Sequence, residues 1–463
     1  MIKKRQISYF SLLEIKESSY SCVENNELDI CNLWGDSKDQ HYVDTGEMFT
    51  AKFPIIIDKD GKACELSIIY IAYCLRNNSD ITGRTLDLIA KDLKSYYEFI
   101  DEKKLTLFHF PTNKFERITT QYRKYLMEQA ISGKGEVSTI KRKINRVISF
   151  YEFLKKQSHL ETVKFENAPY RIKTGKHRFE VDGKYYDKEY RTTDLAVKYS
   201  RNNKEIDCIY DEGKLRPLLR REQEVISEYI SKYAPRTIQL ICSIAFHTGA
   251  RLQTICTIRK KHIEEMYKRK HTSNMTYLLP VGLGTSIDTK KGKKYILEIP
   301  LWLVNDLKKY VESNEWKQRA ERSFYKNSQE NYIFLTKRGQ SFYTSKKEIL
   351  DRKNHIKKYE DKEKFNIQTG EAVRVILYKI YNRILENHKD FKKFRFHDFR
   401  ATFGMNLLNN LIDKNMEVSQ VLHIVKNRMG HSKLVVTEKY LDWRGILEQY
   451  SYIQDELENE LMR

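Results

Sequence analysis

The chain has 463 residues, 40% of them hydrophobic, which is enough for two or three domains with cores of their own. It carries 84 Lys and Arg against 63 Asp and Glu, a formal net charge of +21, so a polyanionic partner is indicated and nucleic acid is the leading candidate. Charge alone does not exclude a merely soluble basic protein.

Several other classes are disfavoured by what the sequence lacks. The most apolar stretch, residues 238–250, is interrupted by His247 and is better explained as a buried helix than as a membrane span. The first five residues lack the apolar core of a signal peptide, so we expect a cytoplasmic, nucleoid-associated protein. The seven cysteines include no C-x-x-C pair, so neither a disulfide framework nor a metal site is expected.

Residues 1–80 have the composition of a small β-containing region. Two strand-like segments, 53–57 and 64–69, flank the turn-like residues 58–62 and predict a hairpin. No residue pattern there suggests chemistry, and a structural cap is favoured over a role in protein contacts.

Residues 81–156 are predicted to form a helical domain, because apolar residues recur there at three- and four-residue steps. Three stripes result: Leu86, Ile89, Leu93, Tyr96 or Tyr97 and Ile100; then Ile118, Tyr122, Tyr125 and Leu126; then Ile140, Ile144, Val147, Ile148, Tyr151 and Leu154.

The helix that carries the third stripe has a strongly basic opposite face, made of Lys141, Arg142, Lys143 and Arg146. Most such faces are simply solvated. Here no acidic residue lies between Glu136 and Glu152, and this single sign of charge favours a helix that lies along a DNA backbone.

The rest of the chain divides into three parts. Residues 157–216 are polar and basic, and predict a linker with irregular or hairpin content. Residues 217–445 predict a larger domain of helices with strands at 277–279 and 295–299, joined through the Lys-rich loop 288–294. Residues 446–463 form a C-terminal region whose amphipathic helix, 447–462, could dock onto a neighbouring protomer or pack onto its own domain, with equal weight. The expected fold class is therefore mainly α with a small antiparallel β-sheet.

Three short strings within 217–445 carry residues suited to phosphate chemistry: Thr248-Gly249-Ala250-Arg251, His397-Asp398-Phe399-Arg400, and Gly430-His431-Ser432 followed by Tyr440. Planar, permanently charged arginines suit the non-bridging oxygens of a phosphodiester under attack. A tyrosine can store the phosphate as an ester, but its ordinary pKa of about 10 means that it must be activated. The departing 5′-oxygen needs a proton donor, which a loop lysine can supply.

In their order and spacing, these strings resemble the signature of the tyrosine recombinases, the phage integrase family of site-specific recombinases. The likeness covers roughly residues 81–445, since segment 81–156 resembles the family's helical core-binding domain. It implies that this domain and an α+β catalytic domain close around DNA as a C-shaped clamp.

The resemblance also implies roles for individual residues. Arg251 and Arg400 would grip the scissile phosphate, His397 would assist as an acid-base or hydrogen-bonding group, and His431 would donate to a non-bridging oxygen. Tyr440 would attack to give a 3′-phosphotyrosyl intermediate. The family's lysine lies in a hairpin ahead of an Ile-Pro pair, here Ile299-Pro300, which favours Lys290 and leaves Lys291 close behind.

Some features depart from the family pattern. An acidic residue often stands three places after the first arginine, but here that position is Thr254, which puts the support of Arg251 in question. Taken singly, His397, Arg400 and Tyr440 could be ordinary packing or ion-pair residues, and only their joint order argues otherwise. Asp398 is expected to cap a helix rather than to catalyse.

The sequence thus predicts an enzyme that cuts and rejoins double-stranded DNA at specific sites, for integration or excision of a mobile element. The resemblance implies a homotetramer on two paired sites, with neither metal nor nucleotide cofactor, and leaves room for an accessory DNA-bending or directionality protein. Two alternatives stay open: a type IB topoisomerase-like or telomere-resolvase enzyme, and a non-catalytic DNA-binding regulator.

Overall fold

The computed structural model describes residues 2–11, 14–15, 42–43, 49–78, 83–156, 165–181, 184–197, 208–211, 213–268, 270–271, 275–359 and 367–446. The chain forms two compact units, residues 1–201 and 202–463, and each is described by itself. The expected C-terminal helix 447–462 lies outside the described residues.

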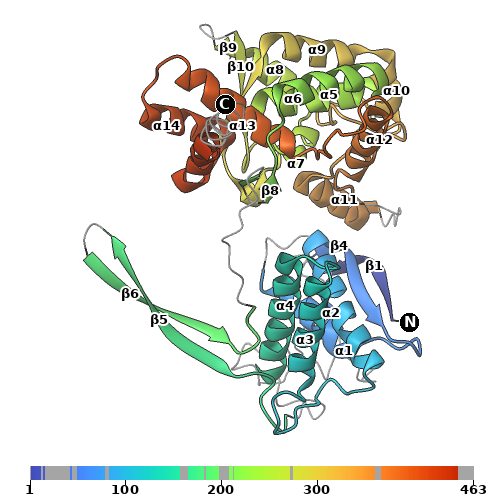
Figure 1. Ribbon diagram of the computed structural model, residues 1–463. Coiled ribbons are helices and arrows are strands. Elements are labelled where there is room, and N and C mark those ends of the chain that lie inside the picture. Colours follow the sequence, from blue (N-terminus) through green and yellow to red (C-terminus); the bar gives the residue numbers. More distant parts are fainter. Residues whose placement is uncertain are drawn as a thin grey trace, which may run out of the picture. The chain divides into compact units, whose positions relative to one another are not determined.

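The first unit is built on four helices (Figure 1): α1 (Glu65–Arg76), α2 (Gly83–Glu102), α3 (Ile118–Ile131) and α4 (Val137–Lys156). The three predicted stripes face their common core. Tyr96, rather than Tyr97, is the fully buried member of the first stripe, and its hydroxyl lies 2.8 Å from that of Tyr151. Burying most of each stripe supplies the apolar contact that holds the helices together.

The N-terminal strands pair differently from the prediction. Strand β4 (Phe49–Ile57) pairs antiparallel with β1 (Lys3–Ser11), and the short β2 (Glu14–Ile15) pairs with β3 (Tyr42–Val43). The predicted strand 64–69 is wrong, because this segment begins helix α1. The apolar run continues beyond residue 69, and Ser67, Tyr70, Ile71 and Leu75 are buried at helical spacing.

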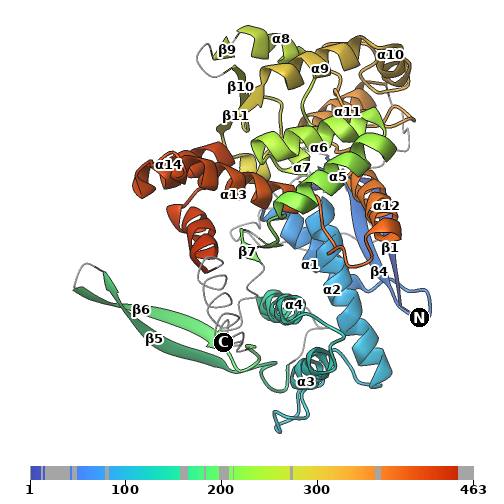
Figure 2. The same ribbon diagram turned by 45° about the horizontal axis from the view of Figure 1, so that its top comes forward.

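A long two-stranded hairpin follows the helices and projects from them in both views (Figures 1 and 2). It consists of β5 (Ile172–Val181) and β6 (Lys184–Thr193), paired from Ile172 opposite Thr193 to Val181 opposite Lys184. The predicted linker therefore has hairpin content, and its last residues, from 208 onward, belong to the second unit.

The second unit is mainly helical. Its helices are α5 (Arg220–Tyr233), α6 (Arg236–Thr248), α7 (Leu252–Cys256), α8 (Lys261–Lys268), α9 (Leu301–Glu312), α10 (Asn314–Glu321), α11 (Lys346–Tyr359), α12 (Glu371–Asn387), α13 (Asp398–Ile412) and α14 (Val418–Met429), and residues 434–446 are also helical. Its sheet has the order β11-β10-β9, from β11 (Tyr295–Pro300), β10 (Thr276–Val281) and β9 (Lys270–His271). The 3-10 turn η2 (Lys290–Gly292) lies between β10 and β11. Both predicted strands are therefore present.

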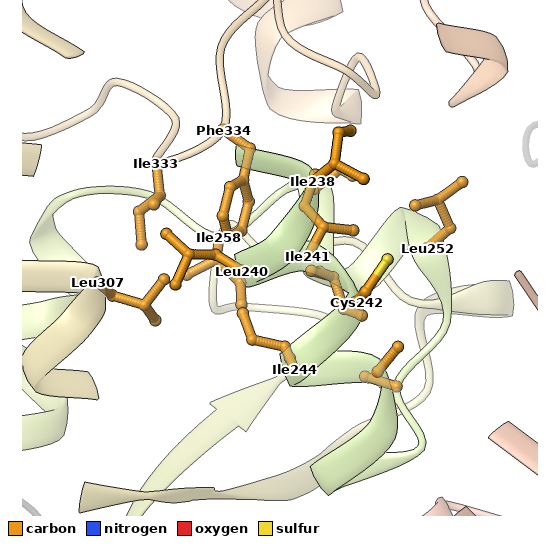
Figure 3. Close-up of a cluster of buried hydrophobic side chains, with 14 of the residues drawn as sticks. Ile238, Leu240, Ile241, Cys242, Ile244, Leu252, Ile258, Leu307, Ile333 and Phe334 are labelled. Atoms are coloured by element: carbon orange, nitrogen blue, oxygen red, sulfur yellow. The ribbon is translucent and has the colours of Figure 1, made fainter. Parts of the chain in front are cut away.

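The main core of this unit surrounds α6 (Figure 3), whose Ile238, Leu240, Ile241 and Ile244 are almost completely buried. Side chains from the following segments complete it, among them Leu252, Ile258, Leu307, Ile333 and Phe334. Because α6 is apolar on nearly every side, it is enclosed by its neighbours, as the sequence predicted. Its C-terminal end is thereby held in place.

A smaller core joins α13, α14 and the helix 434–446. It contains Met405, Leu408, Val425 and Met429, and one side chain from each strand of the short hairpin β7 (Ile209–Tyr210) and β8 (Lys214–Leu215). The hairpin is thus anchored through both of its strands. This core brings the end of the linker to the helices that carry the signature strings.

Candidate active site

Five signature residues lie at helix ends or on neighbouring helices of the second unit. Arg251 is the N-cap of α7, just beyond the left-handed Gly249 that ends α6. His397 is the N-cap of α13 and Arg400 lies in its first turn. His431 follows the left-handed Gly430 that ends α14, and Tyr440 lies on helix 434–446.

A carboxylate that the sequence did not single out joins three of these residues. Oδ2 of Asp211 accepts hydrogen bonds from Nε of Arg400 at 3.0 Å, from Nε2 of His431 at 3.0 Å and from the Tyr440 hydroxyl at 3.1 Å. Asp211 is 1% exposed and lies in the turn between β7 and β8. Its only sequence signal was an acidic residue after two residues of strand character, which is too common to indicate a site.

The guanidinium of Arg400 links two helix ends. Besides its bond to Asp211, Nη1 donates to the Gly249 carbonyl and Nη2 to the Met429 carbonyl, both at 2.8 Å. The last carbonyls of a helix lack partners within it and carry partial negative charge, so a buried cation is well placed there. Burial would lower the pKa of Arg400, but the charge of Asp211 outweighs it and the pKa is raised.

His431 lies between Asp211 and Thr437. Its Nδ1 is 2.9 Å from the Thr437 hydroxyl, and its Nε2 faces the carboxylate. Burial, together with the charge of Arg400, holds the pKa of His431 below its ordinary value despite the nearby carboxylate. The imidazole is therefore neutral near pH 7, and since a carboxylate can only accept, the hydrogen is assigned to Nε2.

Tyr440 is completely buried, but its hydroxyl points into this polar cluster rather than into an apolar interior. Burial and the charge of Asp211 raise the pKa of Tyr440 well above its ordinary value, against the opposite effect of Arg400 and Arg251. The phenol is therefore protonated and a poor nucleophile while the carboxylate faces it.

Asp211 is itself firmly ionised. Burial alone would raise its pKa, but the hydrogen bond from His431 and the charges of Arg400, His431 and Arg251 together hold the pKa well below its usual range. Arg251 thus acts electrostatically on the same cluster.

The lysine prediction is not decided by the geometry. Lys290 and Lys291, in η2, are both exposed, and Lys291 has a left-handed backbone (φ 59°). Another lysine of this loop, Lys293, donates from Nζ to the Gly430 carbonyl at 2.6 Å, next to His431. The sequence did not distinguish it, because several lysines crowd this loop.

The predicted DNA-binding residues of α4 lie in the first unit, apart from this cluster. Arg142 pairs with the buried Asp92 at 2.9 Å, Lys143 donates to the Ser95 hydroxyl, and Arg146 donates to the Tyr70 hydroxyl. Lys141 is exposed. Three of the four side chains thus also stabilise their own helical bundle.

Asp398 has a structural role. Its carboxylate accepts from the backbone N–H groups of Arg216, at 3.0 Å, and Arg395, at 2.7 Å, and so fastens the end of the linker to α13. The helix cap itself is His397, so the expected capping role is replaced by a tie between two segments.

The described residues contain no group of three or more His, Cys, Asp or Glu side chains that could hold a metal ion. No helix in the described part of the chain has the length and apolar character needed to cross a membrane.

An arginine, a histidine and a tyrosine that converge on one anion are groups with which a protein can hold a phosphodiester and attack it through a phenol. Residues 218–444 match the model of the Phage integrase family. This part of the chain, which holds the whole cluster except Asp211, belongs to that family, the tyrosine recombinases.

Several solved structures are similar to the chain. The Tn1549 transposon integrase in complex with a circular intermediate DNA shares 12% identity, at a TM-score of 0.45, over 81% of this chain and 94% of the other. A lambda integrase dimer bound to a COC′ core site shares 13% identity, at a TM-score of 0.45, over 82% of this chain and 77% of the other. A lambda integrase tetramer bound to a Holliday junction shares 12% identity, at a TM-score of 0.43, over 80% of this chain and 77% of the other. No curated protein matches the chain.

Proposed function

We propose that this tyrosine recombinase cuts and rejoins double-stranded DNA at specific sites through Tyr440, in the integration or excision of a mobile element. The observation that carries the proposal is the convergence of Arg400, His431 and Tyr440 on one buried anion. In a DNA complex, a non-bridging oxygen of the scissile phosphate would take the place of the carboxylate oxygen.

The step conserves the energy of the phosphodiester. The Tyr440 oxygen forms a bond to phosphorus as the bond to the 5′-oxygen breaks, giving a 3′-phosphotyrosyl ester and a 5′-hydroxyl. Arg251 and Arg400 stabilise the charge that develops on the phosphate, and neutral His431 donates from Nε2. His397, three residues before Arg400, would act as the acid-base group that takes the phenol proton as Tyr440 attacks. Attack by another 5′-hydroxyl reverses the step, so the chemistry needs no external energy source.

Lys290 is proposed to protonate the departing 5′-oxygen. It lies in the loop between β10 and β11, and its ammonium group is exposed. Lys293 is proposed to position His431 through the Gly430 carbonyl, which it already contacts.

The partners follow from the reaction. Exchange between two duplexes needs four strand cuts, which is consistent with a homotetramer on two paired DNA sites, aided by an accessory DNA-bending or directionality protein. The net charge of +21 suits a DNA partner. The DNA backbone is proposed to contact the basic residues of α4, namely Lys141, Arg142, Lys143 and Arg146. We expect the protein to act in the cytoplasm, in association with the nucleoid.

Tyr440→Phe tests the central role. Wild-type protein incubated with DNA from the flanks of its own gene should form a covalent protein–DNA adduct that survives denaturing electrophoresis, and the variant should form none while still binding DNA. Tyr267→Phe is a matched control, because that hydroxyl lies outside the cluster and bonds Asn305. Adduct formation by Tyr440→Phe, or its absence from wild type on every flanking fragment, would contradict the proposal.

A further inference from the structure

The carboxylate of Asp211 is only half satisfied in its site. Oδ2 accepts three hydrogen bonds, but Oδ1 is buried and has no hydrogen-bond partner among the described residues. Buried carboxylates with a permanent structural role have both oxygens satisfied as a rule. The site therefore supplies hydrogen-bond donors for one oxygen of an anion but not for the second oxygen of this side chain.

The groups around that oxygen are the ones that the proposed function assigns to the phosphate. Nε of Arg400 and Nε2 of His431 would donate to a non-bridging phosphate oxygen. They cannot do so while both donate to the Asp211 carboxylate at 3.0 Å. Two anions that share these donors in a buried site would repel each other strongly.

We propose that Asp211 occupies, in the DNA-free enzyme, the position that a non-bridging oxygen of the scissile phosphate takes, and that it must leave this position before strand cleavage. This inference rests on the proposed function. Until it leaves, Asp211 keeps the positive groups compensated and in place, and holds the nucleophile in its protonated form.

The anchoring of the hairpin determines how the carboxylate can leave. Ile209 and Leu215 are buried in the smaller core on either side of the turn. The Tyr210 carbonyl accepts from Nζ of Lys439 at 2.8 Å, which ties the strand to the helix that carries Tyr440. The strands therefore stay docked, and the exit is a rotation of the Asp211 side chain.

Removal of the carboxylate should open an anion site that can be measured without any DNA. The melting temperature of full-length Asp211→Ala should rise saturably with inorganic phosphate, with chloride used to keep the ionic strength constant. The rise should reach about 5–10 °C at a concentration 100-fold above Kd. Wild type and Asp413→Asn, which removes an exposed carboxylate outside the site, should shift by no more than 1–2 °C, roughly the non-specific salt effect.

The same measurement on Asp211→Asn covers the case in which alanine prevents folding. The amide keeps the shape of the side chain and removes its charge, so this variant should also bind phosphate, more weakly than alanine. Equal phosphate responses of wild type, Asp413→Asn and the folded Asp211 variants would overturn the proposal.

Covalent adduct formation separates this role from catalysis by Asp211. If the carboxylate must leave, Asp211→Ala should form the Tyr440 adduct at least as fast as wild type, and should bind phosphodiester DNA about tenfold more tightly in a Tyr440→Phe background. If Asp211 instead served as the base that activates Tyr440, the adduct rate should fall by roughly 10²–10⁴-fold, which would also overturn the proposal. Absence of adducts from every variant would reject the proposed function and leave the phosphate result standing.

Discussion

At the scale of single residues, reactivity in this protein is governed by how charges compensate one another in a dry site. Arg400 and Asp211 are each 1% exposed, and neither would be tolerated there without the other. The arrangement is costly to disturb, because loss of one partner leaves a buried charge uncompensated. It also means that the phosphate of a substrate would enter a site that already prefers an anion.

The guanidinium plane of Arg400 should be indispensable. Arg400→Lys keeps the charge, but a single ammonium cannot donate to Asp211, Gly249 and Met429 in the directions that the guanidinium plane provides. We therefore expect adduct formation to fall by about 10²–10³-fold. Adduct rates under single-turnover conditions measure this. Arg236→Lys, at an exposed ion pair with Asp306, is the control and should have no effect. Equal activity of the two variants would show that charge alone suffices.

Two buried histidines predict a loss of stability in mild acid. The pKa of His262 is lowered to about 4 and that of His431 is lowered as well, in both cases chiefly by burial. A histidine whose folded pKa lies below its unfolded value of about 6.5 favours folding above that pH, and this contribution is lost as the pH falls. Urea denaturation should therefore show the free energy of unfolding decreasing from about pH 6.5 towards pH 4.

The histidine origin of this loss can be checked by substitution. In His262→Gln the part of the decrease due to that residue should disappear, whereas the same replacement at the exposed His247 should not remove it. A free energy of unfolding that stays constant between pH 6.5 and 4 would contradict the assignment of both histidines as buried and neutral.

At the scale of elements, the two glycine-ended helices position the site. Gly249 and Gly430 turn the chain at the ends of α6 and α14, with φ of 63° and 65°, so that Arg251 and His431 follow directly. Their backbones approach aromatic rings closely, since a Cβ at Gly249 would lie 2.5 Å from the ring of Phe403. Glycine is needed there for both conformation and space.

Gly249→Ala should therefore destabilise the protein and weaken the site together. We expect a loss of about 2–4 kcal/mol in the free energy of unfolding, from left-handed strain and overpacking. Gly284→Ala is the matched control: Gly284 also has positive φ, 93°, but a Cβ there would meet nothing within 4 Å. Equal losses for the two variants, measured by urea denaturation, would exclude the contact with Phe403 as a cause.

The loop between β10 and β11 should contain two lysines with different tasks. Lys290→Ala should lower cleavage of ordinary DNA by about 10²–10⁴-fold, because the 5′-oxygen leaves unprotonated. A substrate with sulfur in place of that bridging oxygen should restore the rate, since a thiolate leaves without a proton. Lys293→Ala should lose activity that sulfur does not restore. If the sulfur substrate restored Lys293→Ala instead, Lys293 would be the proton donor and Lys290 would not.

At the scale of the whole molecule, the excess of basic residues makes binding depend on salt. With roughly 6–10 phosphate contacts, the affinity of the full chain for its DNA should fall by about 10³–10⁵-fold between about 50 and 200 mM salt. Fluorescence anisotropy with Tyr440→Phe measures this without covalent trapping. A shallow salt dependence would contradict an extended contact with the DNA backbone.

The helical stripes, the strands β10 and β11 and the family could all be predicted from the sequence, because each depends on local periodicity or on residues in a fixed order. Segment 64–69 shows where local reasoning fails. A six-residue segment with four apolar residues fits a strand or a helix, and the pairing of β4 with the distant β1 leaves this segment to pack as a helix.

By itself, the sequence determined which residue types the chemistry uses, since each signature string is a short run of consecutive residues that can be recognised without knowing the fold. Only the tertiary structure decided what those residues face. Asp211 lies 189 positions before Arg400 and 229 before Tyr440, and it meets them because the linker hairpin buries Ile209 and Leu215 beside α13 and α14. A contact of that range depends on how cores pack, and no pattern within one segment can encode it.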